Sequence, residues 1–394
     1  MTAGHADGVP AADEPRDASG AARLVTLAVR DFRNIARAEL ALAPEGIAVV
    51  GENGHGKSNL IEAIAYLRLL RSQRGARDRD LIRFGEAAFH VGVELAGTRA
   101  HRATAAVDRQ GRKKVTLDGA EPERLTDALD ALPSVSFSPR DVDLVAGAPA
   151  ERRRYLDITL ALTSRAYLNA LRHYRAALAR RNAALRDAAR AARGAQGEAL
   201  AAVAAWEPAL AEHGAVLVRQ RRDWVAARAD EFARQCVAIG ERGAPALGYD
   251  GALAEAGDVR SALLEALARQ REHDVRRCLT HTGPHRDDLA LSLDGRDLRG
   301  VGSAGQQRTA AIVLRLLEAA THRDATGVTP LLLLDDPFAE LDRRRTGRIL
   351  ALLEEVGTGQ VVLCVPREDE IPARFTRLAR WGVTDGAFAP LEGA

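Results

Sequence analysis

A glycine-rich segment that ends in lysine and serine has the residue types and spacing needed to bind phosphate. The pattern G-x-x-x-x-G-K-[ST] is filled by Gly51, Glu52, Asn53, Gly54, His55, Gly56, Lys57 and Ser58. In such a P-loop the backbone N–H groups cradle phosphates, the lysine ammonium reaches the outer phosphates, and the hydroxyl binds Mg²⁺. The segment therefore predicts a site for ATP with Mg²⁺, in which Lys57 binds phosphate and Ser58 binds the metal. The alternative interpretation is a structural glycine-rich turn.

The second candidate for chemistry is the acidic pair Asp335 and Asp336, which follows the apolar run Leu331–Leu334. A buried strand that ends in a carboxylate can deliver that group to the Mg²⁺ side of bound phosphates. We therefore predict that Asp335 is a metal ligand and that Asp336 is the catalytic base or water-positioning carboxylate. Aspartate is shorter than glutamate, so slow hydrolysis is expected. The alternative is a buried strand that ends in a solvated acidic turn.

Hydrophobic periodicity predicts the elements that position these motifs. In the N-terminal part, strands are predicted at Leu24–Arg30, Ala38–Leu42, Gly46–Val50, Phe89–Leu95, Arg102–Val107 and Val115–Leu117, with a hairpin turn at Asp118-Gly119 and a helix at Ser58–Leu70. In the C-terminal part, helices are predicted at Gly305–Ala320 and Thr346–Val356, and strands at Pro330–Asp335 and Gln360–Val365. Both chemical motifs therefore lie at the ends of core strands.

Changes in composition divide the chain into four parts. Residues 1–22 are rich in Ala, Gly, Asp and Pro, which predicts a disordered extension. Residues 23–145 and 276–394 form the two parts of a predicted ATPase head, the first with the P-loop and the second with the acidic pair. Residues 146–275 are rich in Ala, Arg and Leu and predict a mostly helical insertion. The expected fold class is α/β, with a mixed sheet flanked by helices and split by the insertion.

The distribution of charge is more informative than its total. The formal net charge is +2, but residues 151–193 hold eleven arginines against Glu151, Asp157 and Asp187, which gives 11 − 3 = +8 locally. A surface of this kind suits a polyanion such as DNA, and we predict DNA contacts for Arg152, Arg153 and Arg154. The alternative is a solvated face of arginine-rich helices.

The chain shows no feature of a membrane or secreted protein. It contains no run of about 18 apolar residues, and residues 1–22 lack the apolar core of a signal peptide. We therefore expect a cytoplasmic protein with no membrane partner.

Two segments near the acidic pair resemble motifs of the ABC ATPase superfamily. Gly302–Gln306 resembles the signature motif, and Pro337–Asp342 resembles the D-loop. The resemblance implies that Ser303, Gly305 and Gln306 contact, in trans, the γ-phosphate held by a second subunit, so that ATP joins two heads in a homodimer. A serine at a helix N-terminus suits a phosphate contact. The alternative is a simple helix cap.

Further segments narrow the resemblance to the RecF family. They are Asp31-Phe32-Arg33-Asn34, the arginine run within Pro149–Asp157, and Gly283-Pro284-His285-Arg286-Asp287-Asp288. The order of all the motifs also agrees with that family over about Leu24 to Phe388. The resemblance places Arg33 and Asn34 near the nucleotide.

The functional expectation comes from the resemblance to this family. The resemblance implies an ATP-dependent DNA-binding protein of recombinational repair and replication restart that dimerises on ATP. It would bind gapped DNA or junctions between single- and double-stranded DNA and help load recombinase with RecO and RecR. The expected enzyme activity is a weak, DNA-stimulated ATPase. Cys364 lies near the position where relatives carry a Thr, Ser or His that senses the γ-phosphate, which also favours slow hydrolysis.

Several other functions fit part of the sequence. The pair His281 and His285 could form a metal site together with Asp287, but no further ligand is clustered with them. An ABC transporter ATPase would share the P-loop and the signature but not the large insertion. A chromosome-organising ATPase would need much longer coiled-coil arms. The most serious alternative is an ATP-binding DNA scaffold with little or no hydrolysis.

Overall fold

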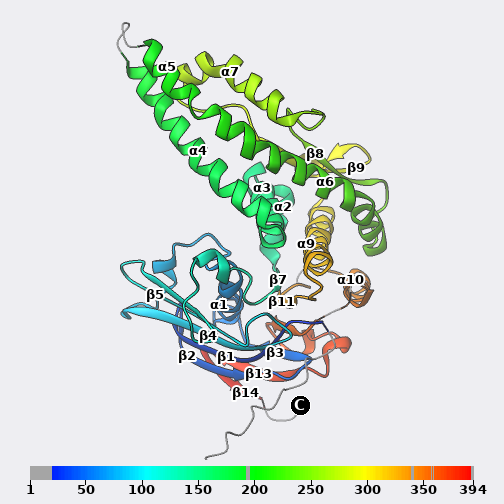
Figure 1. The fold of residues 1–394 in the computed structure, drawn as a ribbon. Helices are drawn as coiled ribbons and strands as arrows, with labels where there is room; N and C mark the ends of the chain where they lie inside the picture. The colour runs from blue at the N-terminus through cyan, green and yellow to red at the C-terminus, as the bar shows by residue number, and fades with distance from the viewer. Residues whose placement is uncertain (1–19, 192–195, 339–340, 356, 358, 392–394) are drawn as a thin grey trace, which may run out of the picture.

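The computed structural model describes residues 20–191, 196–338, 341–355, 357 and 359–391 (Figure 1). Two β-sheets with one helix between them form the lower part of the molecule in Figure 1, and long helices form the upper part. The P-loop segment leads into that helix, which begins at Lys57.

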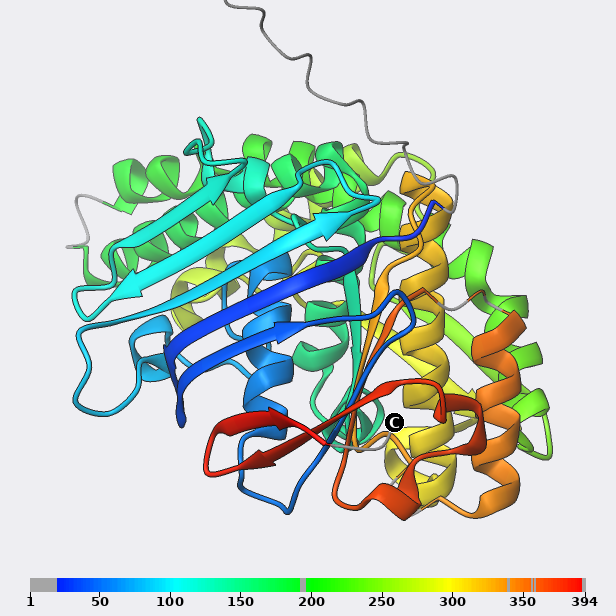
Figure 2. The ribbon, with the colours of Figure 1, turned by 90° about the horizontal axis from the view of Figure 1, so that it is seen from below.

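The first sheet is antiparallel, with strand order β2-β1-β4-β5-β6. Its strands are β1 (Arg23–Phe32), β2 (Ile35–Ala41), β4 (Ala88–Ala96), β5 (Arg102–Asp108) and β6 (Lys113–Leu117). Figure 2 shows this sheet as a twisted layer in blue and cyan. Apolar residues alternate along β4, so one face of the sheet packs on the core.

The second sheet is mostly parallel, with strand order β14-β13-β3-β12-β11-β7. Its strands are β3 (Gly46–Val50), β7 (Ser134–Phe137), β11 (Leu331–Asp335), β12 (Val361–Val365), β13 (Ala379–Thr384) and β14 (Ala387–Pro390). Only β14 pairs in the antiparallel sense within this described sheet. Because parallel strands end at the same edge, the residues after β3 and β11 emerge together.

Both faces of the second sheet are buried, which explains the unbroken apolar sequence of β11. Leu331 and Leu333 belong to the core around α1 (Lys57–Leu69), whereas Leu332 and Leu334 belong to the core under the C-terminal helices. Side chains alternate along a strand, so a strand buried on both faces needs no polar positions. Helix α1 is buried between the two sheets and contacts strands of both.

The helical insertion is built on three long helices. It comprises α2 (Asp143–Ala146), α3 (Pro149–Thr163), α4 (Arg165–Arg190), α5 (Gln196–Ala204), α6 (Glu207–Ile239) and α7 (Val259–Arg277). Helices α4 and α6 lie side by side, with α5 and α7 at their far end (Figure 1). The 26 residues of α4 span about 39 Å at about 1.5 Å per residue.

A small antiparallel sheet crosses the predicted boundary between residues 275 and 276. It consists of β8 (Pro245–Asp250), β9 (Asp288–Leu293) and β10 (Arg296–Asp297), in the order β10-β9-β8. Because β8 and β9 pair along their whole length, residues on both sides of that boundary form one unit. The predicted boundary also falls inside α7.

The C-terminal helices complete the head. They are α8 (Leu298–Val301), α9 (Ala304–Thr326) and α10 (Arg343–Glu355). Short 3-10 helices occur at Asp78–Leu81, Leu125–Ala128, Pro139–Val142, Glu368–Glu370 and Ala373–Phe375. Helix α9 packs on the core beneath α3 and α6, which couples the insertion to the second sheet.

The predicted start of the head needs correction, whereas the predicted turn at Asp118-Gly119 is confirmed. Residues 1–19 of the predicted extension lie outside the described residues, but Ala22 N–H donates to the Thr329 carbonyl over 2.9 Å, so the head includes residues before Arg23. The predicted turn at Asp118-Gly119 is present after β6, where Leu117 and Ala120 exchange backbone hydrogen bonds of 2.9 and 3.0 Å, the pattern of a two-residue hairpin. The connection between β5 and β6 is a second turn, in which Gly111 N–H donates to the Asp108 carbonyl over 2.9 Å. No helix within the described residues has the length and apolar character needed to span a membrane.

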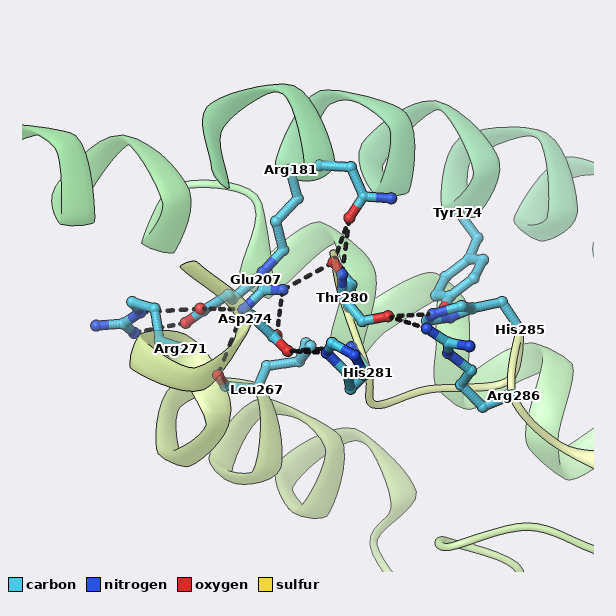
Figure 3. Close-up of polar contacts among 11 residues, drawn as sticks. Tyr174, Arg181, Glu207, Leu267, Arg271, Asp274, Thr280, His281, His285 and Arg286 are labelled. Carbon is cyan, nitrogen blue, oxygen red and sulfur yellow. Dashed lines mark hydrogen bonds and ion pairs between the residues drawn. The ribbon is translucent and has the colours of Figure 1, made fainter. Parts of the chain in front are cut away.

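A buried ionic network braces α4 against α6 and α7 (Figure 3). The Arg181 guanidinium is fully buried and donates to Asp274 Oδ2 over 2.8 Å, to Thr280 Oγ1 over 2.8 Å and to Glu207 Oε1 over 3.1 Å. Arg271 donates to both Glu207 oxygens, over 2.9 and 2.6 Å. These charges are paired across three helices, which fixes how the helices pack.

Candidate nucleotide-binding site

Glycine at two positions gives the loop between β3 and α1 its shape. Gly54 and Gly56 have φ of 89° and 118°, a region that side chains rarely adopt. A Cβ on Gly56 would also lie 3.0 Å from Asn34 Oδ1, so the loop and the β1–β2 turn approach too closely for a larger residue. Successive N–H groups in this conformation, together with the start of α1, form a concave anion cradle.

Lys57 places a positive charge at this cradle. Its side chain is 5% exposed, and its ammonium donates to the carbonyls of Gly51 and Glu52, the latter over 2.9 Å, and to Asn53 Oδ1 over 3.4 Å. Among the described residues it pairs with no carboxylate. The ammonium is therefore held by neutral acceptors of the loop and forms no ion pair among the described residues, although the negative charges of Asp335 and Asp336 are close enough to act on it.

Ser58 and Asp335 meet at the edge where β3 and β11 end. Ser58 Oγ donates to Asp335 Oδ1 over 2.8 Å across 277 residues of sequence. Burial raises the pKa of Asp335, and the hydrogen bond from Ser58 and the charges of Arg74 and Lys57 oppose that effect. A hydroxyl and a carboxylate side by side are oxygen ligands that Mg²⁺ accepts together with phosphate oxygens.

Asp336 lies in an unusual backbone conformation next to this pair. Its φ is 48°, and its N–H donates to the Cys364 carbonyl over 2.9 Å. The carboxylate lines the cleft and has no hydrogen-bond partner among the described residues. Burial and the negative charges of Glu370 and Asp335 raise the pKa of Asp336. The side chain is therefore free to accept a proton from a group in the cleft.

A cleft of about 830 Å³ opens over these residues. The P-loop and the acidic pair line one side of it, and the insertion and α9 line the other through Glu151, Arg154 and Arg315. Arg315 donates to Asp141 Oδ1 over 2.7 Å and to Glu318 Oε2 over 2.7 Å. This pairing connects α9 to the wall of the cleft.

Sequence reasoning missed two charged residues beside the site, Glu62 and Arg74. Glu62 is fully buried within α1, accepts hydrogen bonds from Arg33 over 3.2 and 3.3 Å and from Ser72 Oγ over 2.5 Å, and lies 3.6 Å from Arg74 Nη1. Arg74 lines the cleft, and its Nη2 lies 3.9 Å from Asp335 Oδ2. At about 100° per residue, Glu62 lies on the side of the predicted helix opposite Leu60 and Ile64, so no local signal marked it as buried.

The predicted residues of the β1–β2 turn do lie near the P-loop. Asn59 Nδ2 donates to Asn34 Oδ1 over 2.9 Å, and Arg33 contacts α1 through Glu62. A second turn, between β13 and β14, holds the other side of the loop: Gly386 N–H donates to the His55 carbonyl over 2.9 Å. The loop is thus held from two sides by turns that are distant in sequence.

The predicted signature and D-loop residues do not line this cleft in the single chain. Ser303 caps α9, with Gln306 N–H donating to Ser303 Oγ over 3.3 Å and Ser303 N–H donating to Gln306 Oε1 over 2.9 Å. Ser303 is exposed. Asp342 accepts from Arg345 N–H over 2.8 Å at the start of α10. Residues 339 and 340 of the D-loop segment lie outside the described residues.

The arginine run mainly joins α3 to neighbouring segments. Arg152 is 4% exposed and donates to Asp288 Oδ1 and Oδ2 over 2.8 and 2.7 Å, so the predicted DNA contact is wrong for this residue. Arg153 donates to the Asp287 carbonyl over 2.8 Å, and Arg154 to the Gln73 carbonyl over 3.0 Å. Both are half-buried, and their DNA contacts stay a prediction.

The histidine pair has structural partners. His281 Nδ1 lies 2.9 Å from Asp274 Oδ1, and His285 bonds to Tyr174 OH over 2.6 Å and to the Thr280 carbonyl over 2.9 Å (Figure 3). No cluster of three metal-ligating side chains occurs in the described part of the chain.

Cys364 lies within β12, and its buried thiol is 3.8 Å from the Lys57 carbonyl, so it packs under the P-loop helix.

Comparisons with known proteins agree with this geometry. The family model described as the RecF/RecN/SMC N-terminal domain matches residues 23–374. A DNA replication and repair protein RecF of Anaeromyxobacter sp. is 37% identical over 376 residues, which cover 94% of this chain and 99% of that protein. The RecF of Salinibacter ruber is 36% identical over 355 residues, covering 87% of this chain and 85% of that protein.

Solved structures show the same architecture. A structure described as the recombination mediator protein RecF with ATP in the RecFOR pathway has a TM-score of 0.84 and 26% identity, covering 96% of this chain and all of that one (100%). An Smc head domain of Pyrococcus furiosus has a TM-score of 0.55 at 17% identity over 94% of this chain and 96% of that one, which shows likeness of fold alone. The predicted ABC-type ATPase head with a helical insertion is confirmed.

Proposed function

The chain belongs to the RecF family of DNA replication and repair proteins, and on this premise we propose that it binds Mg-ATP, dimerises around it and then binds DNA. The observation that carries the proposal is the contact between Ser58 and Asp335 at the glycine cradle, beside the Lys57 ammonium, which is held by neutral acceptors. Hydroxyl, carboxylate, ammonium and backbone N–H groups are the set that triphosphate binding requires. Solved RecF structures with ATP support the same ligand.

Each residue of the cleft has a distinct role in this proposal. Lys57 and the loop N–H groups bind the outer phosphates, and Ser58 and Asp335 hold Mg²⁺. The metal, when bound, neutralises charge that develops on the phosphates. Asp336 positions the attacking water and takes up its proton, which its unpartnered carboxylate allows. We propose slow, DNA-stimulated hydrolysis, because Asp336 reaches less far than a glutamate would.

A second copy of the chain completes the site. Ser303, Gly305 and Gln306 lie at an exposed helix N-terminus whose N–H groups favour a phosphate. No residue of this segment lines the cleft of its own chain. In the proposed dimer each signature segment contacts the γ-phosphate held by the other P-loop, so ATP binding and dimerisation depend on each other.

The proposed biological role is recombinational repair and replication restart. The dimer binds gapped DNA or a junction of single- and double-stranded DNA, and it acts with RecO and RecR to load recombinase. The support for these partners is membership of the family and the description of a similar protein as a recombination mediator in the RecFOR pathway. Hydrolysis then opens the dimer and releases DNA.

The test separates nucleotide binding from dimerisation. Lys57→Ala should abolish both ATP binding and ATP-induced dimerisation, because it removes the phosphate cation. Ser303→Ala should leave ATP binding by the monomer intact and abolish dimerisation. The measurement is sedimentation with ATP, ADP or no nucleotide, with and without gapped duplex. Lys114→Ala is the control, since Lys114 is 70% exposed and pairs with Glu121 on the surface.

Two outcomes would contradict parts of the proposal. Equal loss of ATP binding and dimerisation in Ser303→Ala would remove the trans role of the signature. A wild-type protein that does not bind Mg-ATP would contradict the whole proposal. A second candidate, an ATP-binding scaffold with little hydrolysis, is favoured by the short side chain of Asp336. Phosphate release that stays at background with duplex DNA, while ATP still induces dimers, would establish that candidate.

A further inference from the structure

A second basic cavity lies within the helical insertion, at its junction with the head. Its volume is about 230 Å³, and its walls come from α3, α4, α6 and the loop before β9. The charged side chains around it are Arg153, Arg154, Arg175, Arg221 and Asp157. Arg154 also lines the nucleotide cleft, so the two hollows are neighbours.

The positive charge of this cavity is only partly compensated. Asp157 is the one carboxylate in its described lining, and it accepts from Arg221 over 2.7 Å and from Arg175 over 2.8 Å. Arg153 and Arg154 bond to backbone carbonyls and pair with no carboxylate among the described residues. Within the lining itself four guanidiniums face one carboxylate, while the negative charges of Asp288 and Asp287 act on Arg153 from beyond it.

Arg71 adds a fifth guanidinium beside the same group. It follows the C-cap of α1, its side chain is exposed, and no ion pair joins it to a described residue. Although part of the side chain is exposed, its partial burial and the positive charges of Arg154 and Arg175 lower the pKa of Arg71, and the charge of Asp157 opposes them. Burial likewise lowers the pKa of Arg153. Cations gathered in this way repel one another, and an anion among them would relieve that repulsion.

The remaining lining selects an anion over a cation. Tyr174 OH donates to His285 Nδ1 over 2.6 Å, and His285 Nε2 donates to the Thr280 carbonyl over 2.9 Å, as Figure 3 shows. Both polar groups are thus used within the wall. Leu171, Leu178 and Leu217 make the rest of the surface apolar. The cavity therefore offers guanidinium N–H donors to a ligand. Its one carboxylate, Asp157, already accepts hydrogen bonds from Arg175 and Arg221.

We propose that the cavity between α3 and α4, with Arg71 at its edge, binds a phosphate group. Guanidiniums match phosphate oxygens in both geometry and charge. The volume is below the range of about 300–1,000 Å³ that holds a whole drug-sized ligand, so the site takes one phosphate and the atoms next to it. The phosphate belongs either to a nucleic-acid backbone or to a free anion, and only the first source depends on the proposed DNA-binding function.

Inorganic phosphate tests the free-anion source. The protein is used with Lys57→Ala, which removes phosphate binding at the P-loop. Sodium phosphate should raise its unfolding temperature more than sodium chloride of equal ionic strength. Adding Arg71→Gln and Arg175→Gln should reduce that extra shift by about half or more. Both side chains are exposed, Arg175 by 55%, so the fold tolerates the changes.

A DNA duplex tests the nucleic-acid source in protein with native Lys57 and a slowly hydrolysed ATP analogue. Arg71→Gln with Arg175→Gln should weaken binding about tenfold and reduce the slope of log affinity against log salt by about one for each lost phosphate contact. The control is Arg186→Gln with Arg190→Gln, which makes the same charge change on exposed residues of α4 outside the cavity.

The two measurements give decisive outcomes. A loss confined to the cavity variant in either assay supports the site and identifies the source of its phosphate. Equal behaviour of the cavity variant and the control in both assays overturns it. Failure of the wild-type protein to bind ATP would contradict the proposed function, yet the phosphate measurement would still report on the cavity, because the Lys57→Ala protein does not rely on nucleotide.

Discussion

The nucleotide cleft and the core of the helical insertion both contain buried or half-buried charged side chains, but the charges are paired in the insertion, whereas the cleft leaves some of its charges without ion pairs among the described residues. In the insertion, Arg181 is buried and pairs with two buried carboxylates, Glu207 and Asp274. In the cleft, Lys57 bonds to neutral carbonyls, and Asp336 has no partner among the described residues. The charges of the insertion are closed off from solvent, whereas those of the cleft face an open space of about 830 Å³.

The difference shows how charge compensation separates architecture from function. A buried ion pair is costly to form and costlier to break, so it fixes one packing of its helices. A cation held by neutral acceptors, near a carboxylate that has no hydrogen-bond partner, keeps its charge available for a ligand. Glu62 stands between the two cases, because it is buried like Glu207 but orients Arg33 and Arg74 beside the cleft.

The largest effect should come from breaking the closed network. Arg181→Met leaves Asp274 and Glu207 buried without their shared cation, so it should lower the free energy of unfolding by about 3–5 kcal/mol. Urea unfolding measures the change. Arg186→Met, on the exposed side of the same helix, should stay within about 0.5 kcal/mol. Similar stabilities for the two variants would mean that the network does not brace the insertion.

A matched pair of buried glutamates tests whether the two regions differ in function. Glu62→Gln removes the charge that holds Arg33 and Arg74, so it should weaken ATP binding about tenfold, or about 1.4 kcal/mol. Glu207→Gln removes an equally buried charge next to Arg181 and Arg271 and should destabilise the fold without changing ATP affinity. ATP titration of both folded variants measures this.

The comparison would fail if both glutamates behaved alike. Equal loss of ATP affinity would mean that the insertion network reaches the cleft. Unchanged affinity in Glu62→Gln would mean that Arg33 and Arg74 do not need their buried partner for nucleotide binding.

The smallest effect is a pH dependence that arises in the insertion. Burial, with the nearby charges of Arg286 and Arg153, lowers the pKa of His285 from 6.5 to about 4. Between these values the unfolded chain binds a proton that the folded chain does not, so stability is present above pH 6.5 and is lost as the pH falls toward 4. We expect a loss of about 1 kcal/mol from about pH 7 to about pH 5.5.

Urea unfolding at several pH values measures that loss. His285→Asn should remove most of this part of the pH dependence, because the substituted side chain does not titrate. ATP affinity per folded molecule should keep the same value in the variant, since His285 does not line the nucleotide cleft. An unchanged pH profile in His285→Asn would assign the titration to another group.

Sequence reasoning was most successful where consecutive residues make the site. The P-loop and the acidic end of β11 are local features, so their residues, their order and the elements around them could be predicted. Ser303 shows the limit of this reasoning: its capping role is local and visible, whereas its proposed contact with ATP depends on a second chain. The order of motifs along the chain was enough to identify the fold class.

What remained hidden was the choice of partner between distant segments. Arg152 and Arg154 lie two positions apart in one arginine run, yet one is buried against Asp288, 136 residues away, and the other lines the cleft. A helix turns about 100° per residue, so adjacent identical side chains face different surroundings. The sequence by itself determined which backbone can hold phosphate. Only the tertiary structure decided which charges are neutralised in the core and which stay available, because that depends on what packs against each face.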